Sequence, residues 1–440
     1  MEDVLSSLED KEIIELLYLS LIEKSQKLNN LKDRLTLNSP NSLDEKLKSK
    51  FRACEKEALK KFNSFNESVQ QQLSKTKPVR IYMDGVFDII HSGHFNAFRQ
   101  AQYLGDILVC GLNSDKDVAK AKGKTLMDIK ERSSLAGSSK WIGEIALDTP
   151  YTPSIETLDT YNCDYLAHGD DIPTNELGQT IYDDIIAKKR LRVFRRTEGI
   201  STTVIIGRLL LGMKNKFDTL DEKDPKNMEL KKSYEELEKT SNLQYGTMTT
   251  LLTTSYRISE FSNKKLPKTG DKVVYICGEF DVLHQVQIEA LKKAKELGDY
   301  TYIGVYDDLT VNKRKGKYHP VLNINERCLN LLALKYVDDV IFGAPERITE
   351  DLIHNLNVNV VIKFITPKMK EGKCDNEEKN YEVAKKLGIL KEIELSGELT
   401  NDVLSDRIWE NKEQYIKKYI KKIQKVDEHI KIDGQEVQQL

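Results

Sequence analysis

The chain carries one sequence pattern twice. The Gly-x-Phe-Asp of 85–88 recurs at 278–281, an offset of 193 residues from Gly85 to Gly278. The Lys-Gly-Lys of 122–124 recurs at 315–317 with the same offset, and Glu131-Arg132 recurs 195 residues later. An offset that stays nearly constant over the length of a domain indicates duplication. The 440 residues therefore contain at least two related domains, as their number also favours.

The first copy alternates strand-like and helical segments. Val79 to Met83 is a strand-like run, Gly85 follows in a turn, and apolar residues at helical spacing extend from Phe95 to Ala101. Further strand-like runs lie at 107–111, near Trp141-Ile142, at 165–167 and at 191–194. This alternation predicts an α/β fold of two tandem Rossmann-like domains with parallel sheets, which bind ligands at the carboxyl ends of their strands.

The sequence divides into five segments. We expect a helical N-terminal extension at 1–77, a first domain at 78–212, a partly helical and partly irregular linker at 213–270, a second domain at 271–408 and a C-terminal helix at 409–440. Leucine and isoleucine recur at helical spacing in the extension. We favour a helical cap on the first domain over a docking or oligomerisation arm.

The C-terminal helix is basic and amphipathic. Its apolar face includes Ile416, Tyr419 and Ile423. Residues 411–425 contain six lysines and one acidic residue, Glu413. These lysines are at 412, 417, 418, 421, 422 and 425. Such a helix can bind an anionic membrane surface or a partner. We favour a terminal helix packed on the second domain with its lysines in water, and keep the membrane contact as the alternative.

Charge and cysteine content restrict the class of protein. The 68 Lys and Arg residues against 70 Asp and Glu leave a net charge of −2, unlike a generic nucleic-acid binder. The six cysteines form no Cys-x-x-Cys pair and fit buried thiols. Met1 to Val4 lack the basic start of a signal peptide, and no apolar run approaches the roughly 20 residues that span a bilayer. We expect a cytoplasmic protein and leave peripheral contact with the endoplasmic reticulum open.

The turn after the first strand is suited to phosphate. His91 and His94 flank Gly93 where a helix is predicted to begin. Free backbone N–H groups and the positive end of the helix dipole favour an anion there, and two imidazoles add donors. The alternative is an ordinary turn with histidines that cap it. The pair of histidines, the glycines and the preceding strand favour a phosphate cradle.

The second copy lacks this set of residues. At the offset of 193, Gly93 becomes Val286 and His94 becomes Gln287. The valine adds a side chain where a phosphate must approach the backbone, and Glu394 and Glu398 would repel an anion. We therefore expect the second domain to be inactive.

Three motifs of the first copy resemble those of the cytidylyltransferase branch of the HxGH nucleotidyltransferases. The motifs are 85–94, which ends in His-Ser-Gly-His, Lys122-Gly123, and Arg-Thr-Glu-Gly-Ile-Ser-Thr-Thr at 196–203. This resemblance implies catalysis by His91, His94, Lys122 and Arg196. The CTP-binding residues that it implies are Gly85, Val86, Phe87, Gly93, Arg196, Thr197, Gly199, Ser201 and Thr202.

The acceptor end of the site resembles the branch that uses phosphoethanolamine. The choline branch typically has tryptophan where Tyr151 stands, because aromatic faces suit a quaternary ammonium. Fewer aromatic faces, with Asp170 and Asp171 nearby, favour a primary ammonium. The arrangement of an intact copy before a degenerate one is similar to this branch as well. The acceptor-binding residues implied are Asp88, Lys122, Tyr151, His168, Asp170 and Asp171.

The resemblance implies transfer of the cytidylyl group of CTP to phosphoethanolamine, which gives CDP-ethanolamine and pyrophosphate. We expect Mg²⁺ on the CTP phosphates and assign no metal ligands. An interface between the two domains within the chain is implied, and a homo-oligomer stays open. Two alternatives remain: phosphocholine as acceptor, and a CTP-binding sensor without catalysis.

Overall fold

The computed structural model describes residues 77–172, 180–244, 251–365, 377–395 and 401–437. The expected N-terminal extension therefore lies outside the described residues except for Lys77, and so does Glu398. Residues Val79–Leu440 form one compact unit of the chain. Within the described residues, no helix is long and apolar enough to cross a membrane.

The first domain is built on a parallel five-stranded sheet with the strand order β3-β2-β1-β4-β5. Its strands are β1 (Arg80–Gly85), β2 (Ile107–Asn113), β3 (Glu144–Thr149), β4 (Tyr165–Gly169) and β5 (Leu191–Phe194). Its helices are α4 (Ser92–Gln102), α5 (Asp115–Ala121), α6 (Ile129–Gly137), α7 (Ile155–Thr160), α8 (Asp183–Ala187) and α9 (Thr202–Leu211). The third strand was predicted near Trp141 and begins slightly later in the sequence, at Glu144.

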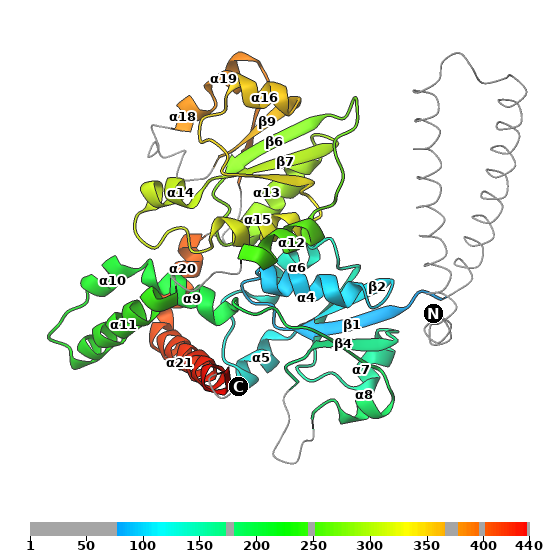
Figure 1. Ribbon diagram of the computed structural model, residues 1–440, viewed down its shortest axis with the longest axis vertical. Helices are drawn as coiled ribbons and strands as arrows, with labels where there is room; N and C mark the ends of the chain where they lie inside the picture. Colours follow the sequence, from blue (N-terminus) through cyan, green and yellow to red (C-terminus); the bar gives the residue numbers. More distant parts are fainter. Residues whose placement is uncertain (1–76, 173–179, 245–250, 366–376, 396–400, 438–440) are drawn as a thin grey trace, which may run out of the picture. The chain divides into compact units, whose positions relative to one another are not determined.

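The second domain repeats this topology. Its parallel sheet has the order β8-β7-β6-β9-β10, the same as in the first domain when the strands are matched along the chain. The strands are β6 (Val273–Gly278), β7 (Tyr300–Val305), β8 (Asp339–Phe342), β9 (Val358–Ile365) and β10 (Leu390–Glu394). The helices are α13 (Gln285–Lys295), α14 (Asp308–Lys315), α15 (Ile324–Leu332), α16 (Glu350–Asn355), α18 (Glu377–Asn380), α19 (Glu382–Lys386) and α20 (Asn401–Glu410). The predicted fold class of two tandem α/β domains is confirmed (Figure 1).

The sequence explains both the elements and the core. The central strands β1 and β6 are runs of apolar residues buried on both faces, as helices on both sides of a parallel sheet require. Asp128 and Asn323 occupy equivalent positions and begin α6 and α15 with the same capping box, in which the side chain accepts from the backbone N–H three residues later. The four described cysteines are buried and form no disulfide with one another, as expected.

The described part of the segment between the domains is largely helical. It contains α10 (Lys214–Asp218), α11 (Pro225–Gln244) and α12 (Leu251–Phe261). Phe217 stacks on Tyr234 at 4.2 Å between ring centroids, and the Tyr234 hydroxyl donates to the Leu211 carbonyl. Phe261 is fully buried against Trp141. These apolar residues pack the helices of the segment, whereas most of 262–270 has no regular secondary structure.

The C-terminal helix α21 (Lys412–Val437) packs on the first domain. It lies beside α9 and α11, as Figure 1 shows. A Cβ at Gly207 of α9 would be 2.2 Å from the Tyr419 ring, so the glycine lets the two helices touch. The expectation that this helix packs on the second domain was wrong. Gly207 lies in α9 and the apolar face of α21 fits against it.

The two domains meet through contacts that repeat in pairs. Lys140 donates its backbone N–H to the Ala333 carbonyl, and Lys335 donates to the Ser138 carbonyl, both at 2.9 Å. Lys140 and Ser138 are related to Lys335 and Ala333 by the 195-residue offset. Each domain therefore donates one of the two hydrogen bonds and accepts the other, as across a two-fold axis. The helix pairs α4 with α15 and α13 with α6 are in contact and follow the same relation.

Two ion pairs cross the same interface in opposite directions. Arg208 of α9 pairs with Glu326 of the second domain at 2.8 Å and donates to the Val321 carbonyl at 3.2 Å. Arg407 of α20 pairs with Glu131 of the first domain at 2.7 and 2.9 Å and donates to the Leu126 carbonyl at 2.7 Å. Each domain thus holds the loop and helix that follow the Lys-Gly-Lys segment of the other.

Candidate active site

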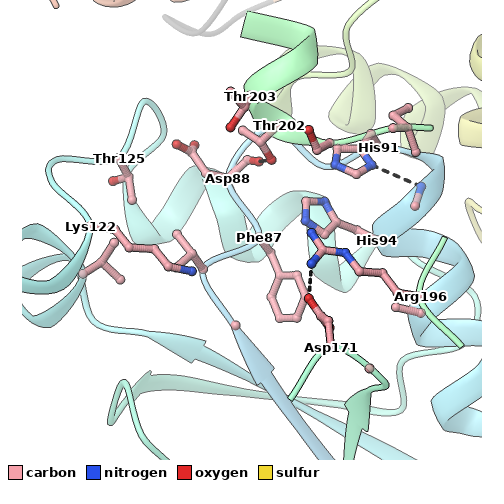
Figure 2. A pocket seen from close by; sticks show the side chains of 18 of the residues that line it. Phe87, Asp88, His91, His94, Lys122, Thr125, Asp171, Arg196, Thr202 and Thr203 are labelled. Carbon is pink, nitrogen blue, oxygen red and sulfur yellow. Dashed lines mark hydrogen bonds and ion pairs between the residues drawn. The ribbon is translucent and has the colours of Figure 1, made fainter. Parts of the chain in front are cut away.

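A pocket of about 730 Å³ lies at the carboxyl ends of β1 and β4 in the first domain. Its walls come from the turn after β1, the N-terminal ends of α4 and α9, the loop 122–125 and helix α21. Figure 2 shows His91 and His94 side by side, with Lys122 across the pocket from them. This is where a doubly wound parallel sheet is expected to bind its ligand.

The two histidines form a stacked, neutral pair. Their ring centroids are 4.0 Å apart, and His91 Nδ1 accepts the Gly93 backbone N–H at 3.1 Å as the N-cap of α4. Burial lowers the pKa of His94 to about 4 and that of His91 well below its usual value. Because His91 Nδ1 is an acceptor, its proton resides on Nε2. Both rings are therefore uncharged hydrogen-bonding groups near neutral pH.

Gly93 is needed for this arrangement. A Cβ there would lie 2.9 Å from His91 Cε1 and 3.0 Å from Ile200 Cγ2. The equivalent Val286 of the second domain carries such a side chain. The first helical turn therefore offers its amides to a ligand only in the first domain.

Two cationic side chains of the site come from segments distant in the sequence. Lys122 follows α5, with Nζ 5.5 Å from the centre of the Tyr151 ring. Arg196 follows β5, and its guanidinium forms an ion pair with the Asp171 carboxylate (Figure 2). Asp170 accepts the Arg196 backbone N–H at 2.9 Å, so this carboxylate fixes the arginine backbone.

The N-terminus of α9 completes the phosphate-binding face. Ser201 is its N-cap and accepts the Val204 N–H. Thr202 Oγ1 donates to the Asp88 carbonyl at 3.1 Å, and Thr197 Oγ1 accepts from the Asn96 amide at 2.8 Å. Ser201, Thr202 and Thr203 line the same pocket as the N-terminal end of α4, and the positive end of each helix dipole favours an anion there.

Asp88 has a different task from the one predicted. Its carboxylate accepts the backbone N–H groups of Leu126 and Met127 at 2.8 and 3.0 Å, and burial raises its pKa. The equivalent Asp281 binds the amides of Val321 and Leu322 in the same way. A carboxylate that makes the same contacts in both copies serves the fold, because it ties the loop to the turn. The interpretation of the Asp88 side chain as an acceptor ligand is therefore not supported.

Asp84 is an acid that the motifs did not assign to substrate. It lines the pocket, accepts from the Asn113 amide at 3.1 Å, and burial raises its pKa to about 6. The second domain has Cys277 at this position. This difference between the copies is visible in the sequence and marks Asp84 as part of the site.

The structure brings most of the predicted residues together. Of the site residues implied by the sequence, Tyr151, Asp170 and Gly199 do not line the pocket, and the others do. Sequence reasoning missed Tyr415, Lys418 and Lys422 of α21, which also line it. Their signal was the basic stripe of the C-terminal helix, which we interpreted as a solvated face.

The second domain fills the equivalent cradle with its own side chains. Glu279 stands where the first domain has Val86, and its carboxylate pairs with Lys315, the counterpart of Lys122. Gln287 caps α13 by accepting the His284 N–H, where the first domain has His94. A carboxylate that occupies the lysine leaves that lysine unable to serve an anionic substrate.

Comparison with known proteins agrees with this architecture. The Cytidylyltransferase-like family matches residues 82–211 and 275–387, one stretch in each domain. An ethanolamine-phosphate cytidylyltransferase of Dictyostelium discoideum is 39% identical over 344 residues, which cover 77% of this chain and 93% of the relative. The chain belongs to the ethanolamine-phosphate cytidylyltransferase family.

Other relatives in this family have the same extent. The proteins of that name from Arabidopsis thaliana and Mus musculus are 34% and 32% identical over 80% and 77% of this chain, and 85% and 87% of their own lengths are covered. By contrast, choline-phosphate cytidylyltransferase 2 of Arabidopsis thaliana is 37% identical over only 31% of this chain. The likeness to the ethanolamine-phosphate cytidylyltransferase family thus extends over both domains.

Proposed function

We propose that the pocket of the first domain transfers the cytidylyl group of CTP to phosphoethanolamine, with release of pyrophosphate. The observation that carries this proposal is the convergence of two stacked neutral histidines, two helix N-termini, Lys122 and Arg196 in one pocket. In the second domain the lysine that corresponds to Lys122 is paired with Glu279. Membership of the family supplies the substrates.

The chemistry requires alignment and charge stabilisation. A phosphate oxygen of phosphoethanolamine attacks the α-phosphorus of CTP and forms a new P–O bond, while the bond from the α-phosphorus to the bridging oxygen breaks and pyrophosphate leaves with its electrons. The nucleophile is already an anion, so no general base is needed. The histidine N–H groups stabilise charge that develops on the transferred phosphoryl group. Lys122 bridges the two anionic substrates.

The acceptor end of the pocket offers a carboxylate for a primary ammonium. Asp171 is paired with Arg196, whereas Asp84 accepts a hydrogen bond only from the neutral Asn113 amide among its described side-chain contacts. His168 also lines this end, and its ring lies 5.0 Å from that of Tyr182. An ammonium that donates to Asp84 forms a charged hydrogen bond, which the three methyl groups of choline prevent.

Mg²⁺ enters this reaction as part of the nucleotide substrate. Among the described residues, no group of three or more His, Cys, Asp or Glu side chains is arranged to hold a metal ion. We expect the CTP phosphates to carry the ion into the pocket, because their oxygens are themselves Mg²⁺ ligands. The cytoplasmic location and a homo-oligomeric state stay predictions.

The test is pyrophosphate release by the purified chain with CTP and Mg²⁺, with phosphoethanolamine and phosphocholine compared at equal concentrations. The proposal predicts turnover that is much faster with phosphoethanolamine. Faster turnover with phosphocholine would contradict the acceptor assignment. CTP binding without pyrophosphate release from either acceptor would favour a sensor.

A further inference from the structure

The C-terminal helix forms one wall of the catalytic pocket. Tyr415, Lys418 and Lys422 of α21 line the pocket together with residues of the first domain. The helix starts more than 200 residues after the last motif of that domain, at Thr203. Its two lysines therefore bring positive charge to the site from outside both matched regions of the family, which end at residue 387.

Lys422 lies where the phosphate-binding face is formed. Its Nζ donates to Ser201 Oγ at 2.5 Å, and Ser201 is the N-cap of α9. Burial, with Arg196 nearby, lowers the pKa of this ammonium, and its charge also acts on His91. Among the described residues, no carboxylate lies within ion-pair distance of Lys422. A half-buried cation beside a helix N-terminus, without a counterion, fits an anionic ligand.

Packing holds this cation in place. Ile416, Tyr419 and Ile423 are at most 2% exposed, and Tyr419 lies directly on Gly207. Lys418 Nζ donates to the Lys122 carbonyl at 3.2 Å, so the same helix also contacts the backbone of the catalytic lysine. The described apolar face of α21 is thus occupied by the first domain, which argues against a membrane surface as its partner.

We propose that Lys422 is a CTP ligand that binds the triphosphate at the N-terminus of α9. This assignment rests on the proposed function insofar as the nucleotide is CTP. Because both histidines are neutral, the positive charge that faces the triphosphate comes from Arg196, Lys122 and the Mg²⁺ that accompanies CTP. An ammonium at Ser201 adds a further positive charge at the N-terminus of α9.

The experiment compares Lys422→Gln with Lys421→Gln, which removes the same charge from an exposed neighbour on the same helix. Dissociation constants for CTP and CMP with Mg²⁺ are measured by calorimetry, alongside melting temperatures. Lys422→Gln should weaken CTP binding about tenfold or more, the effect of losing one charge-assisted hydrogen bond. CMP binding should change much less, while Lys421→Gln should match the wild type for both. Lys422→Arg should restore most of the CTP affinity.

Several results would overturn the assignment. One is CTP binding by Lys422→Gln that equals that of Lys421→Gln. Another is an equal loss of CTP and CMP binding, which would indicate a distorted helix. If Lys422→Gln does not fold, Lys422→Met takes its place in the same comparison. Failure of the proposed function would give another result. Lys422→Gln would still weaken CTP binding, but the wild type would release no pyrophosphate with phosphoethanolamine.

Discussion

The contact between Arg407 and Glu131 tests whether the second domain supports catalysis in the first. Arg407 makes two hydrogen bonds to a Glu131 carboxylate that is 9% exposed and a third to the Leu126 carbonyl. Leu126 also donates its N–H to Asp88. Arg407 therefore holds the far end of the loop that begins at Lys122.

The expected cost of Arg407→Met follows from these contacts. Breaking a buried ion pair by removal of one partner costs about 3–5 kcal/mol. Arg407 is 34% exposed and Glu131 keeps its bond to the Asp128 N–H, so water and the cap offset part of this loss. We expect a destabilisation of about 2–3 kcal/mol, which for a unit of this size lowers Tm by about 3–4 °C. Because the Lys122 loop loses its support, kcat/KM should fall by about tenfold or more.

The duplicated fold provides a matched control. Arg208→Met removes the equivalent pair with Glu326, which supports the loop of the second domain. It should lower Tm at least as much, because Arg208 is only 9% exposed, and leave kcat/KM close to the wild-type value. Thermal melts and steady-state pyrophosphate release measure both quantities. Equal losses of kcat/KM in the two variants, or none in Arg407→Met, would refute the idea that α20 positions the catalytic loop.

Two further predictions concern the acids of the site. Burial places the pKa of Asp84 near 6, so its carboxylate is charged above that pH and is lost as an ammonium ligand below it. The KM for phosphoethanolamine should therefore rise more steeply below pH 6 in the wild type than in Asp84→Asn. In that variant only the phosphate of the substrate still titrates. Parallel plots of KM against pH for the two proteins would contradict this role. Asp88→Asn and Asp281→Asn should each destabilise the protein by about 1–3 kcal/mol, because an amide cannot accept both backbone N–H groups. Thermal melts should show similar Tm losses for the two variants, and turnover should fall only in Asp88→Asn. An Asp88→Asn variant as stable as the wild type would refute the structural role that Asp88 shares with Asp281.

Much of the fold was predictable because its signals are local or repeated. Alternation of strand and helix patterns defined both sheets, and the constant offset from Gly85 to Gly278 showed that one topology is used twice. The motif residues His91, His94 and Arg196 lie in one pocket because each follows a parallel strand of the same sheet. Parallel strands end at the same edge, so position relative to a strand predicts proximity in space.

The remaining features depend on long-range packing. Lys422 reaches the pocket because Tyr419 fits against Gly207, and neither residue carries a local signal for that contact. Asp88 was assigned to the acceptor substrate from the resemblance of its motif to the family. Its counterpart Asp281, retained in a copy that has Val286 and Gln287 in place of Gly93 and His94, was the available sign of a structural role. Comparison of the two copies thus separates residues of the fold from residues of the site.

The central claim is that only the first copy carries out the chemistry. The most direct test compares His94→Ala with Gln287→Ala, the same position in the two domains, by pyrophosphate release with CTP, Mg²⁺ and phosphoethanolamine. His94→Ala should lower kcat by about two orders of magnitude or more, the effect of losing a group that stabilises transition-state charge. Gln287→Ala should leave kcat near the wild-type value. Comparable losses from both variants would contradict the claim.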